Sequence, residues 1–325
     1  MVKTIEIRGV PHAYELTPAT DANTVLVFVH GWLLSREYWR PIIQRLSTQY
    51  QCLSYDLRGF GDSQPLPKRA ERSPTLENHH YSSPPFHRSN GDRLTPPPLE
   101  TAPTDDYSDS RYCPAAYAED LSQLLQTLQI SEAWLVGHSL GGSIALWTAA
   151  QLPEAIAGVI CVNSGGGIYL KEEFERFRAA GQQLVKLRPR WLCYLPLIDL
   201  MMTRMNVAQP IARHWGRRRL MDLVIAHPEA ALGALLDSTT ETEVHHLPQL
   251  IARLEQPVYF IAGANDDVME PQYVRHLASF HPSFQACGNN VMEIPNCGHL
   301  AMIEQPEAVA QQIHTILDQY GDRPS

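Results

Sequence analysis

The fold is decided by residues 133–141, AWLVGHSLG. The first four are apolar and predict a buried strand, and the apolar run that continues to Leu152 predicts a helix. Between strand and helix the chain must turn so sharply that Ser139 takes a strained conformation, which exposes its hydroxyl. Gly137 and Gly141 let strand and helix approach without side-chain clashes. A G-x-S-x-G turn in this context predicts a serine nucleophile.

Apolar runs of strand length recur along the chain, separated by amphipathic helices. Tyr117, Leu121 and Leu128 lie on one helical face, and a second such pattern covers residues 309–320. Apolar strands that alternate with helices are typical of a parallel sheet covered on both faces. We therefore predict an α/β fold, a doubly wound and mostly parallel sheet with a helical lid insertion. The expected strands are 25–29, 51–55, 133–136, 158–162, 258–261 and 291–294.

Two segments interrupt this alternation. Residues 64–114 hold ten of the 25 prolines and little aliphatic content. They cannot supply a packed core, so we expect a disordered or irregular surface loop. Residues 164–249, called the lid below, contain several helical patterns where a single crossover helix would suffice. The expected organisation is a core of residues 1–163 and 250–325 with the lid inserted into it.

Composition excludes several classes of protein. The chain has 26 Lys and Arg against 35 Asp and Glu, a net charge of −9, whereas nucleic-acid binding needs a positive surface. No apolar run is long enough to span a membrane, and no secretory signal is visible. The scattered cysteines are expected to be reduced, which favours a cytoplasmic location. We expect neither a metal nor a cofactor, because no ligand set or binding motif is present.

Backbone amides near the serine turn form a second candidate feature. His30-Gly31-Trp32 directly follows the expected strand 25–29. An amide at such a strand end can face the nucleophile of a neighbouring strand. We expect the N–H groups of Trp32 and Leu140 to form an oxyanion hole.

Two later strand ends carry an acid and a base. Asp266 and Asp267 follow the strand 258–261, and we favour Asp266 as the acid. His299 follows the strand 291–294 and is the candidate base. The chain order Ser139, Asp266, His299 is that of hydrolases with a nucleophile elbow.

One further motif carries a resemblance to a known family. Residues 56–63, DLRGFGDS, are similar to the D-x-R-G-x-G-x-S turn of the α/β-hydrolase superfamily, and the resemblance covers about residues 4–320. It implies that Ser139 is the nucleophile, His299 the base and Asp266 its orienting acid. Dehalogenases and epoxide hydrolases of this fold carry aspartate instead of the serine, so neither activity is expected. The long segment 64–114 departs from the family and is expected to alter access to the site. Parts of the chain look most like uncharacterised cyanobacterial members.

The expected reaction is hydrolysis of a carboxylic ester through an acyl-enzyme. The same three residues also serve thioesterases, carbon–carbon bond hydrolases and lyase-type synthases, and some relatives of this fold are ligand receptors. These alternatives stay open.

The composition of the lid indicates a class of substrate. Residues 171–219 contain eleven Lys and Arg against four Asp and Glu, and eleven of the fifteen residues 191–205 are apolar. Apolar and basic character together favour a lipophilic ester and a peripheral contact with an anionic membrane surface. The alternative is an ordinary helix core with a solvated face. The residues expected to line the substrate pocket are His30, His138, Trp191, Leu195 and Met201.

Overall fold

The computed structural model describes residues 1–64, 110–165, 171–195, 197–287 and 290–320. Most of the proline-rich segment 64–114 lies outside the described residues. Eight described strands form one sheet in the order β1-β2-β4-β3-β5-β6-β7-β8. β1 and β2 run antiparallel, β2 is antiparallel to β4, and all the other pairs are parallel. The strands are β1 Lys3–Ile7, β2 Val10–Leu16, β3 Val25–Val29, β4 Gln51–Tyr55, β5 Ala133–His138, β6 Ile156–Val162, β7 Val258–Gly263 and β8 Val291–Ile294.

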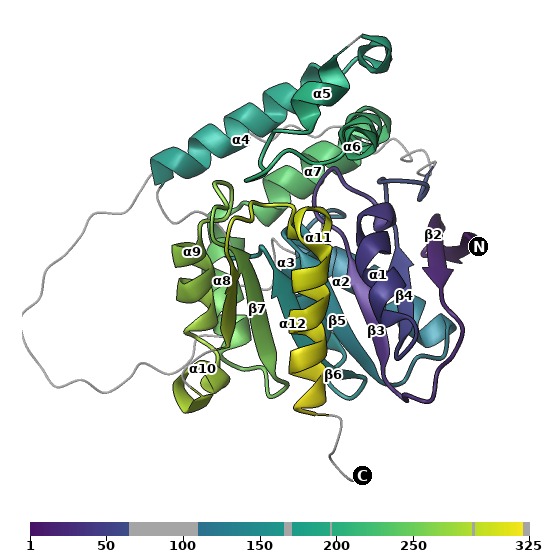
Figure 1. Ribbon diagram of the computed structural model, residues 1–325, viewed down its shortest axis with the longest axis vertical. Helices are drawn as coiled ribbons and strands as arrows, with labels where there is room; N and C mark the ends of the chain where they lie inside the picture. Colours follow the sequence, from purple (N-terminus) through teal and green to yellow (C-terminus); the bar gives the residue numbers. More distant parts are fainter. Residues whose placement is uncertain (65–109, 166–170, 196, 288–289, 321–325) are drawn as a thin grey trace, which may run out of the picture. The chain divides into compact units, whose positions relative to one another are not determined.

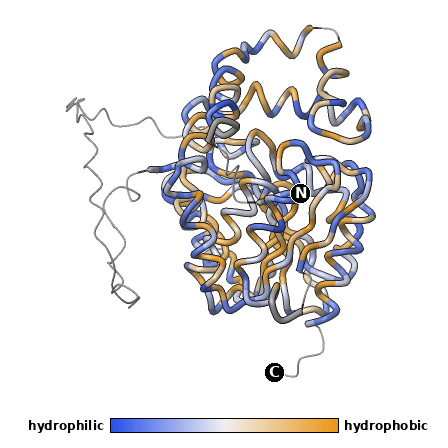
Figure 2. Tube along the Cα trace, turned by 90° about the vertical axis from the view of Figure 1, so that its left-hand side faces the viewer, coloured by the Kyte–Doolittle hydropathy of each residue, from blue (hydrophilic) through white to orange (hydrophobic). Residues whose placement is uncertain are grey.

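Helices cover both faces of this sheet (Figure 1). Apolar side chains of one face pack with α1 (Arg40–Leu46), α11 (Ala301–Glu304) and α12 (Pro306–Asp318). Those of the other face pack with α2 (Pro114–Thr127), α3 (Leu140–Gln151) and α9 (Pro271–Ala278). In Figure 2 apolar residues, in orange, recur throughout the body of the trace. The predicted α/β fold with a mostly parallel sheet is confirmed. The remaining helices are η1 Arg36–Trp39, α4 Lys171–Lys186, η2 Arg190–Tyr194, α5 Ile198–Met202, α6 Arg213–Ile225, α7 Pro228–Ser238, α8 Glu241–Ile251 and α10 Pro282–Cys287.

The β1–β2 hairpin was not predicted. Its turn consists of Arg8 and Gly9, which have φ angles of 52° and 77° between the paired residues Ile7 and Val10. Two residues with positive φ form the type I′ turn that matches the twist of a hairpin. Gly9 is the sequence signal for this turn, but the strands flanking it are short and partly polar, so neither has a continuous apolar run.

The lid contains the elements from α4 to α8. Its helix α4 contacts α7, and α6 contacts α5 and η2. α8 spans the expected boundary at residue 249 and also contacts α3, which belongs to the core. Among the described residues, no helix is long and apolar enough to cross a bilayer.

Candidate active site

Ser139 lies between β5 and α3 in a conformation that only a few non-glycine residues adopt. Its φ is 52° and its ψ is −120°. The Ser139 N–H donates to the Val162 carbonyl at 3.0 Å, and the Ser164 hydroxyl donates to the Ser139 carbonyl at 2.9 Å. A Cβ atom on Gly141 would lie 2.3 Å from the Val29 carbonyl oxygen, so only glycine fits there. Neighbouring strands therefore hold the strained serine in place.

Asp266 is the acid that the structure places against His299. Its Oδ2 accepts a hydrogen bond from His299 Nδ1 at 2.8 Å, and its Oδ1 accepts from the amides of Val268 and Met269, both at 2.9 Å. Asp266 is buried, whereas the rival Asp267 is exposed. The geometry thus brings together the two residues at the ends of β7 and β8.

The ionised Asp266 carboxylate determines which tautomer the His299 imidazole adopts. Burial acts to raise the pKa of Asp266, but the charge and hydrogen bond of His299 and the two amides lower it below its usual range. The carboxylate is ionised at neutral pH and accepts the proton on His299 Nδ1. The His299 Nε2 atom is then the free basic nitrogen, as a general base requires.

His138 connects the serine turn to His299. Its Nε2 lies 2.8 Å from the His299 carbonyl oxygen, and the two ring centroids are 4.9 Å apart. Burial lowers the pKa of His138 to about 3, so the ring is neutral and Nε2 donates to the carbonyl. No hydrogen bond joins the Ser139 hydroxyl to His299 within the described part of the chain. His138, the residue before Ser139, is thus linked to the backbone of His299.

His30 and His138, which were expected to line the substrate pocket, are held by hydrogen bonds to the backbone, and their part in binding substrate stays a prediction. Both are buried, with 0 % and 1 % of their surface exposed. The Leu57 amide donates to His30 Nε2 at 2.9 Å, and His30 Nδ1 lies 2.8 Å from the Gly31 carbonyl oxygen. Both rings hydrogen-bond to the backbone and stabilise loops at the strand ends.

The two amides expected in the oxyanion hole lack internal acceptors. Neither the Trp32 N–H nor the Leu140 N–H donates to any residue that the structure describes. Leu140 is the first residue of α3, where backbone amides are unsatisfied and the helix dipole favours negative charge. The Trp32 indole donates to the Ala231 carbonyl of α7 at 2.7 Å. This bond holds Trp32 against the lid.

Asn163 is a site residue that the sequence did not reveal. Its amide nitrogen donates to Asp266 Oδ2 at 2.8 Å and to the Gly298 carbonyl at 3.1 Å. It is buried and has a φ of 48°. Its signal in the sequence is weak, because a single asparagine after β6 also fits an ordinary turn.

The turn at residues 56–63 contacts the loop that follows β3. Asp56 accepts hydrogen bonds from the backbone amides of Arg36 and Asp62 at 2.7 and 2.8 Å, and it forms an ion pair with the Arg36 guanidinium. A Cβ on Gly61 would lie 2.4 Å from this carboxyl group, and Gly61 has a φ of 50°. This network orients the loop that follows β3, and none of its members contacts the Asp266–His299 pair.

A second group of contacts joins the lid to that loop. The Ser35 hydroxyl donates to Asp222 Oδ2 at 3.1 Å, and Arg218 donates to Asp222 at 2.9 Å and to Ser35 at 2.8 Å. Burial raises the pKa of Asp222 to about 6, and the contact with Arg218 opposes this shift. These bonds hold α6 against Ser35 in the loop that follows β3.

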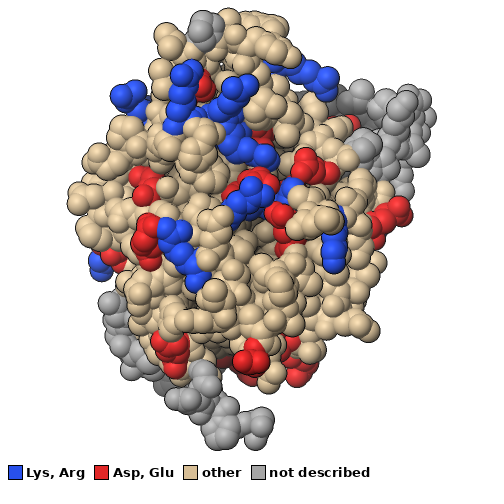
Figure 3. Space-filling view, turned by 45° about the vertical axis from the view of Figure 1, so that its right-hand side comes forward, with Lys and Arg blue, Asp and Glu red and all other residues tan. Residues whose placement is uncertain are grey.

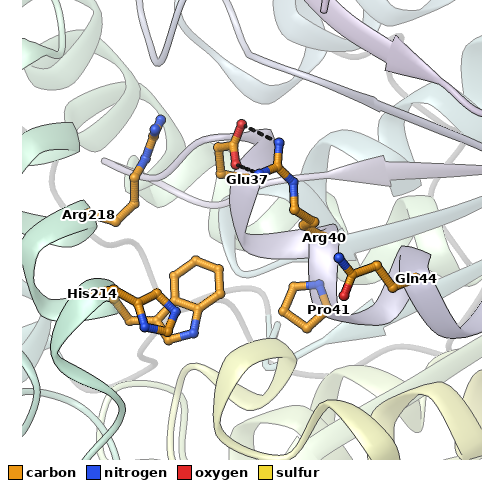
Figure 4. A pocket seen from close by; sticks show the side chains of 7 residues that line it. Glu37, Arg40, Pro41, Gln44, His214 and Arg218 are labelled. Carbon is orange, nitrogen blue, oxygen red and sulfur yellow. Dashed lines mark hydrogen bonds and ion pairs between the residues drawn. The ribbon is translucent and has the colours of Figure 1, made fainter. Parts of the chain in front are cut away.

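Beside Arg218 lies a pocket of about 420 Å³ (Figure 4). Arg218 and His214 face it from α6, and Glu37 and Arg40 face it from the opposite side. Neither Ser139 nor the Asp266–His299 pair lines it. The full lining is Glu37, Arg40, Pro41, Gln44, His214, Trp215 and Arg218.

The three lid residues expected in the substrate pocket are largely exposed. Trp191 is 58 %, Leu195 42 % and Met201 62 % exposed. None of them lines the pocket of Figure 4, and their role in binding substrate stays a prediction.

Comparison with known proteins places the chain in a family. Residues 26–312 match the model of the alpha/beta hydrolase family. The chain belongs to the alpha/beta hydrolase family. Among curated proteins, this hydrolase is 29 % identical over 218 residues to a 2-succinyl-6-hydroxy-2,4-cyclohexadiene-1-carboxylate synthase of Enterobacter sp. (strain 638), covering 65 % of this chain and 78 % of the relative. It is 26 % identical to a pimeloyl-[acyl-carrier protein] methyl ester esterase of Edwardsiella ictaluri, covering 87 % and 88 %.

Solved structures share the fold of this hydrolase. A thermophilic esterase from Thermogutta terrifontis superimposes with a TM-score of 0.68 at 21 % identity, covering 98 % of each chain. A lipase, described as putative, from Acinetobacter baumannii reaches a TM-score of 0.71 at 19 % identity, covering 98 % of this chain and 91 % of that one. At these identities the likeness establishes the architecture alone.

Proposed function

We propose that this hydrolase cleaves a carboxylic ester of a lipophilic substrate through an acyl-enzyme formed on Ser139. The observation that carries this proposal is the buried hydrogen bond between Asp266 Oδ2 and His299 Nδ1. A buried carboxylate fixed by several donors, paired with a histidine whose backbone is hydrogen-bonded to the residue before a strained serine, is an arrangement that suits nucleophilic catalysis.

The mechanism follows from the tautomer of the histidine. His299 Nε2 takes the proton of the Ser139 hydroxyl as the serine oxygen attacks the ester carbonyl, and Asp266 stabilises the resulting imidazolium. The tetrahedral oxyanion accepts hydrogen bonds from the Trp32 and Leu140 amides, each worth on the order of 3 kcal/mol. The imidazolium then protonates the leaving alcohol. Water, deprotonated by His299, attacks the acyl-enzyme and releases the acid.

The relatives support an ester as the substrate, and the lid supports its lipophilic character. The Edwardsiella ictaluri relative is named as a methyl ester esterase and covers most of the chain. The lid holds four of the eight methionines, and flexible thioether side chains suit irregular apolar ligands. A wide range of apolar acyl chains would then be accommodated.

A series of p-nitrophenyl esters from acetyl to palmitoyl tests this proposal. We expect kcat/KM to rise by about tenfold or more between the acetyl and octanoyl esters, because each buried methylene adds to the binding free energy. A flat or falling series would contradict a lipophilic pocket. If none of the esters were hydrolysed, the proposal that the substrate is a carboxylic ester would be contradicted.

A second candidate is elimination chemistry of the synthase type, since the relative with 29 % identity is named as a synthase. In that case His299 would abstract a proton from the substrate and no acyl-enzyme would form. This second function would be supported if the protein hydrolysed no ester but converted the substrate of the synthase. A single slow turnover with retained ligand would instead indicate a receptor.

A further inference from the structure

The outer side of the lid exposes large apolar side chains. Twelve large hydrophobic residues of the described chain are exposed, and nine of them lie between residues 184 and 225. The most exposed of these nine are Tyr194 at 86 %, the last residue of η2, and Leu187 at 71 %, which precedes η2; η2 itself has no buried residue. A concentration of exposed apolar residues marks an interaction surface. We call the following residues the apolar strip: Leu187, Trp191, Tyr194, Leu195, Leu197 and Met201.

Exposed cationic side chains lie close to the apolar strip. Lys186, Arg190, Arg204 and Arg217 are exposed, and none forms an ion pair with a residue that the structure describes. In Figure 3 the Lys and Arg side chains gather in the upper part, where the lid lies, below a largely uncharged tip. Asp and Glu side chains lie mostly lower on this face. This distribution contrasts with the net charge of −9 for the whole chain.

We propose that the apolar strip docks into the headgroup region of an anionic lipid bilayer. Trp191 and Tyr194 are amphipathic aromatic residues of the kind that concentrate at membrane interfaces. The surrounding guanidinium and ammonium groups attract anionic headgroups, while the leucines enter the acyl boundary. Because no described helix can span a bilayer, the contact is peripheral.

A second copy of the chain fits this surface less well. A symmetric dimer would place the same patch on both partners, so the cations around one strip would face those around the other. Within η2 the exposed Trp191 and Tyr194 are separated by the partly buried Leu192 and Cys193, whereas a stable protein interface needs closely complementary packing. A bilayer accepts such protruding side chains and supplies the opposite charge.

Co-sedimentation with vesicles tests this inference, with Ser139→Ala protein used in parallel so that docking is scored independently of activity. We expect binding to phosphatidylcholine vesicles that contain phosphatidylglycerol, and weaker binding to phosphatidylcholine alone. Leu187→Ser with Tyr194→Ser should weaken binding by about tenfold. Gln at Arg190, Arg204 and Arg217 should weaken it by about fivefold per residue at low salt. The matched controls Phe280→Ser and Arg253→Gln, exposed outside the lid, should leave binding unchanged.

Three results would overturn the proposal. One is absence of wild-type binding to the anionic vesicles at low salt. Another is binding that the lid variants do not weaken, or that Phe280→Ser weakens equally. The third is a dimer in sedimentation velocity that Leu187→Ser with Tyr194→Ser dissociates, which would assign the strip to a second copy. Thermal unfolding of each variant shows whether its fold is intact.

Discussion

Asp266→Asn is expected to lower kcat for ester hydrolysis by on the order of 10³–10⁴, because the amide no longer holds His299 in the tautomer with a free Nε2. Asp267→Asn, one residue away, is expected to change kcat by less than about twofold. The physical difference is the hydrogen bond of 2.8 Å between Asp266 and His299, and the exposure of Asp267. Steady-state kinetics on one soluble ester compares the two variants.

Asparagine keeps the size of Asp266, so a loss of activity would not arise from a cavity. The pair of variants shares chemistry and location along the chain, and therefore each controls for the other. Comparable rates for Asp266→Asn and the wild type would contradict the assigned acid. A large loss in Asp267→Asn alone would transfer that role to Asp267.

Gly141→Ala is expected to destabilise the protein by about 3 kcal/mol or more. The added Cβ would lie 2.3 Å from the Val29 carbonyl oxygen and 2.7 Å from that of His30, and both atoms belong to backbone that cannot rotate away. The end of β3 must therefore move, which also shifts the loop that carries Trp32. We expect the Tm to fall by about 6 °C or more.

Gly181→Ala is the matched control for this prediction. In α4 a Cβ at Gly181 approaches the Leu235 methyl group to 2.6 Å, and a side-chain terminus can shift. Alanine is also favoured over glycine within helices, so the Tm should stay within about 3 °C of the wild type. An unchanged Tm in Gly141→Ala would contradict the close approach of strand and helix at the serine turn.

Most strands that carry the site could be predicted because their apolar runs are buried, whereas β8 is an edge strand with an exposed Glu293. Residues 25–29, 51–55 and 291–294 form strands with the expected bounds, and 133–136 forms most of β5. Continuous apolar runs of this length, separated by helices, seldom form anything other than strands of a sheet covered on both faces. β2, in contrast, is antiparallel at the side of the sheet and contains Pro11 and Glu15, so its pattern resembles that of a loop.

Some residues of the candidate site could also be predicted from the sequence, and others could not. Ser139, Asp266 and His299 follow strands whose ends meet at one edge of a parallel sheet, so their order along the chain indicates their proximity. The orientations of His30 and His138 depend on backbone groups of other loops, the Leu57 amide that donates to His30 and the His299 carbonyl that accepts from His138, and no local pattern encodes them. The hydrogen bond from Asn163 to Asp266 could not be predicted either, because the two residues are 103 positions apart in the chain.

The central claim is that Ser139 is a nucleophile activated by His299. The most direct test is the rate of p-nitrophenyl butyrate hydrolysis by the wild type and by Ser139→Ala, at matched concentration and with equal Tm. We predict that Ser139→Ala lowers kcat by on the order of 10⁴–10⁶. Equal rates for the two proteins would contradict the claim.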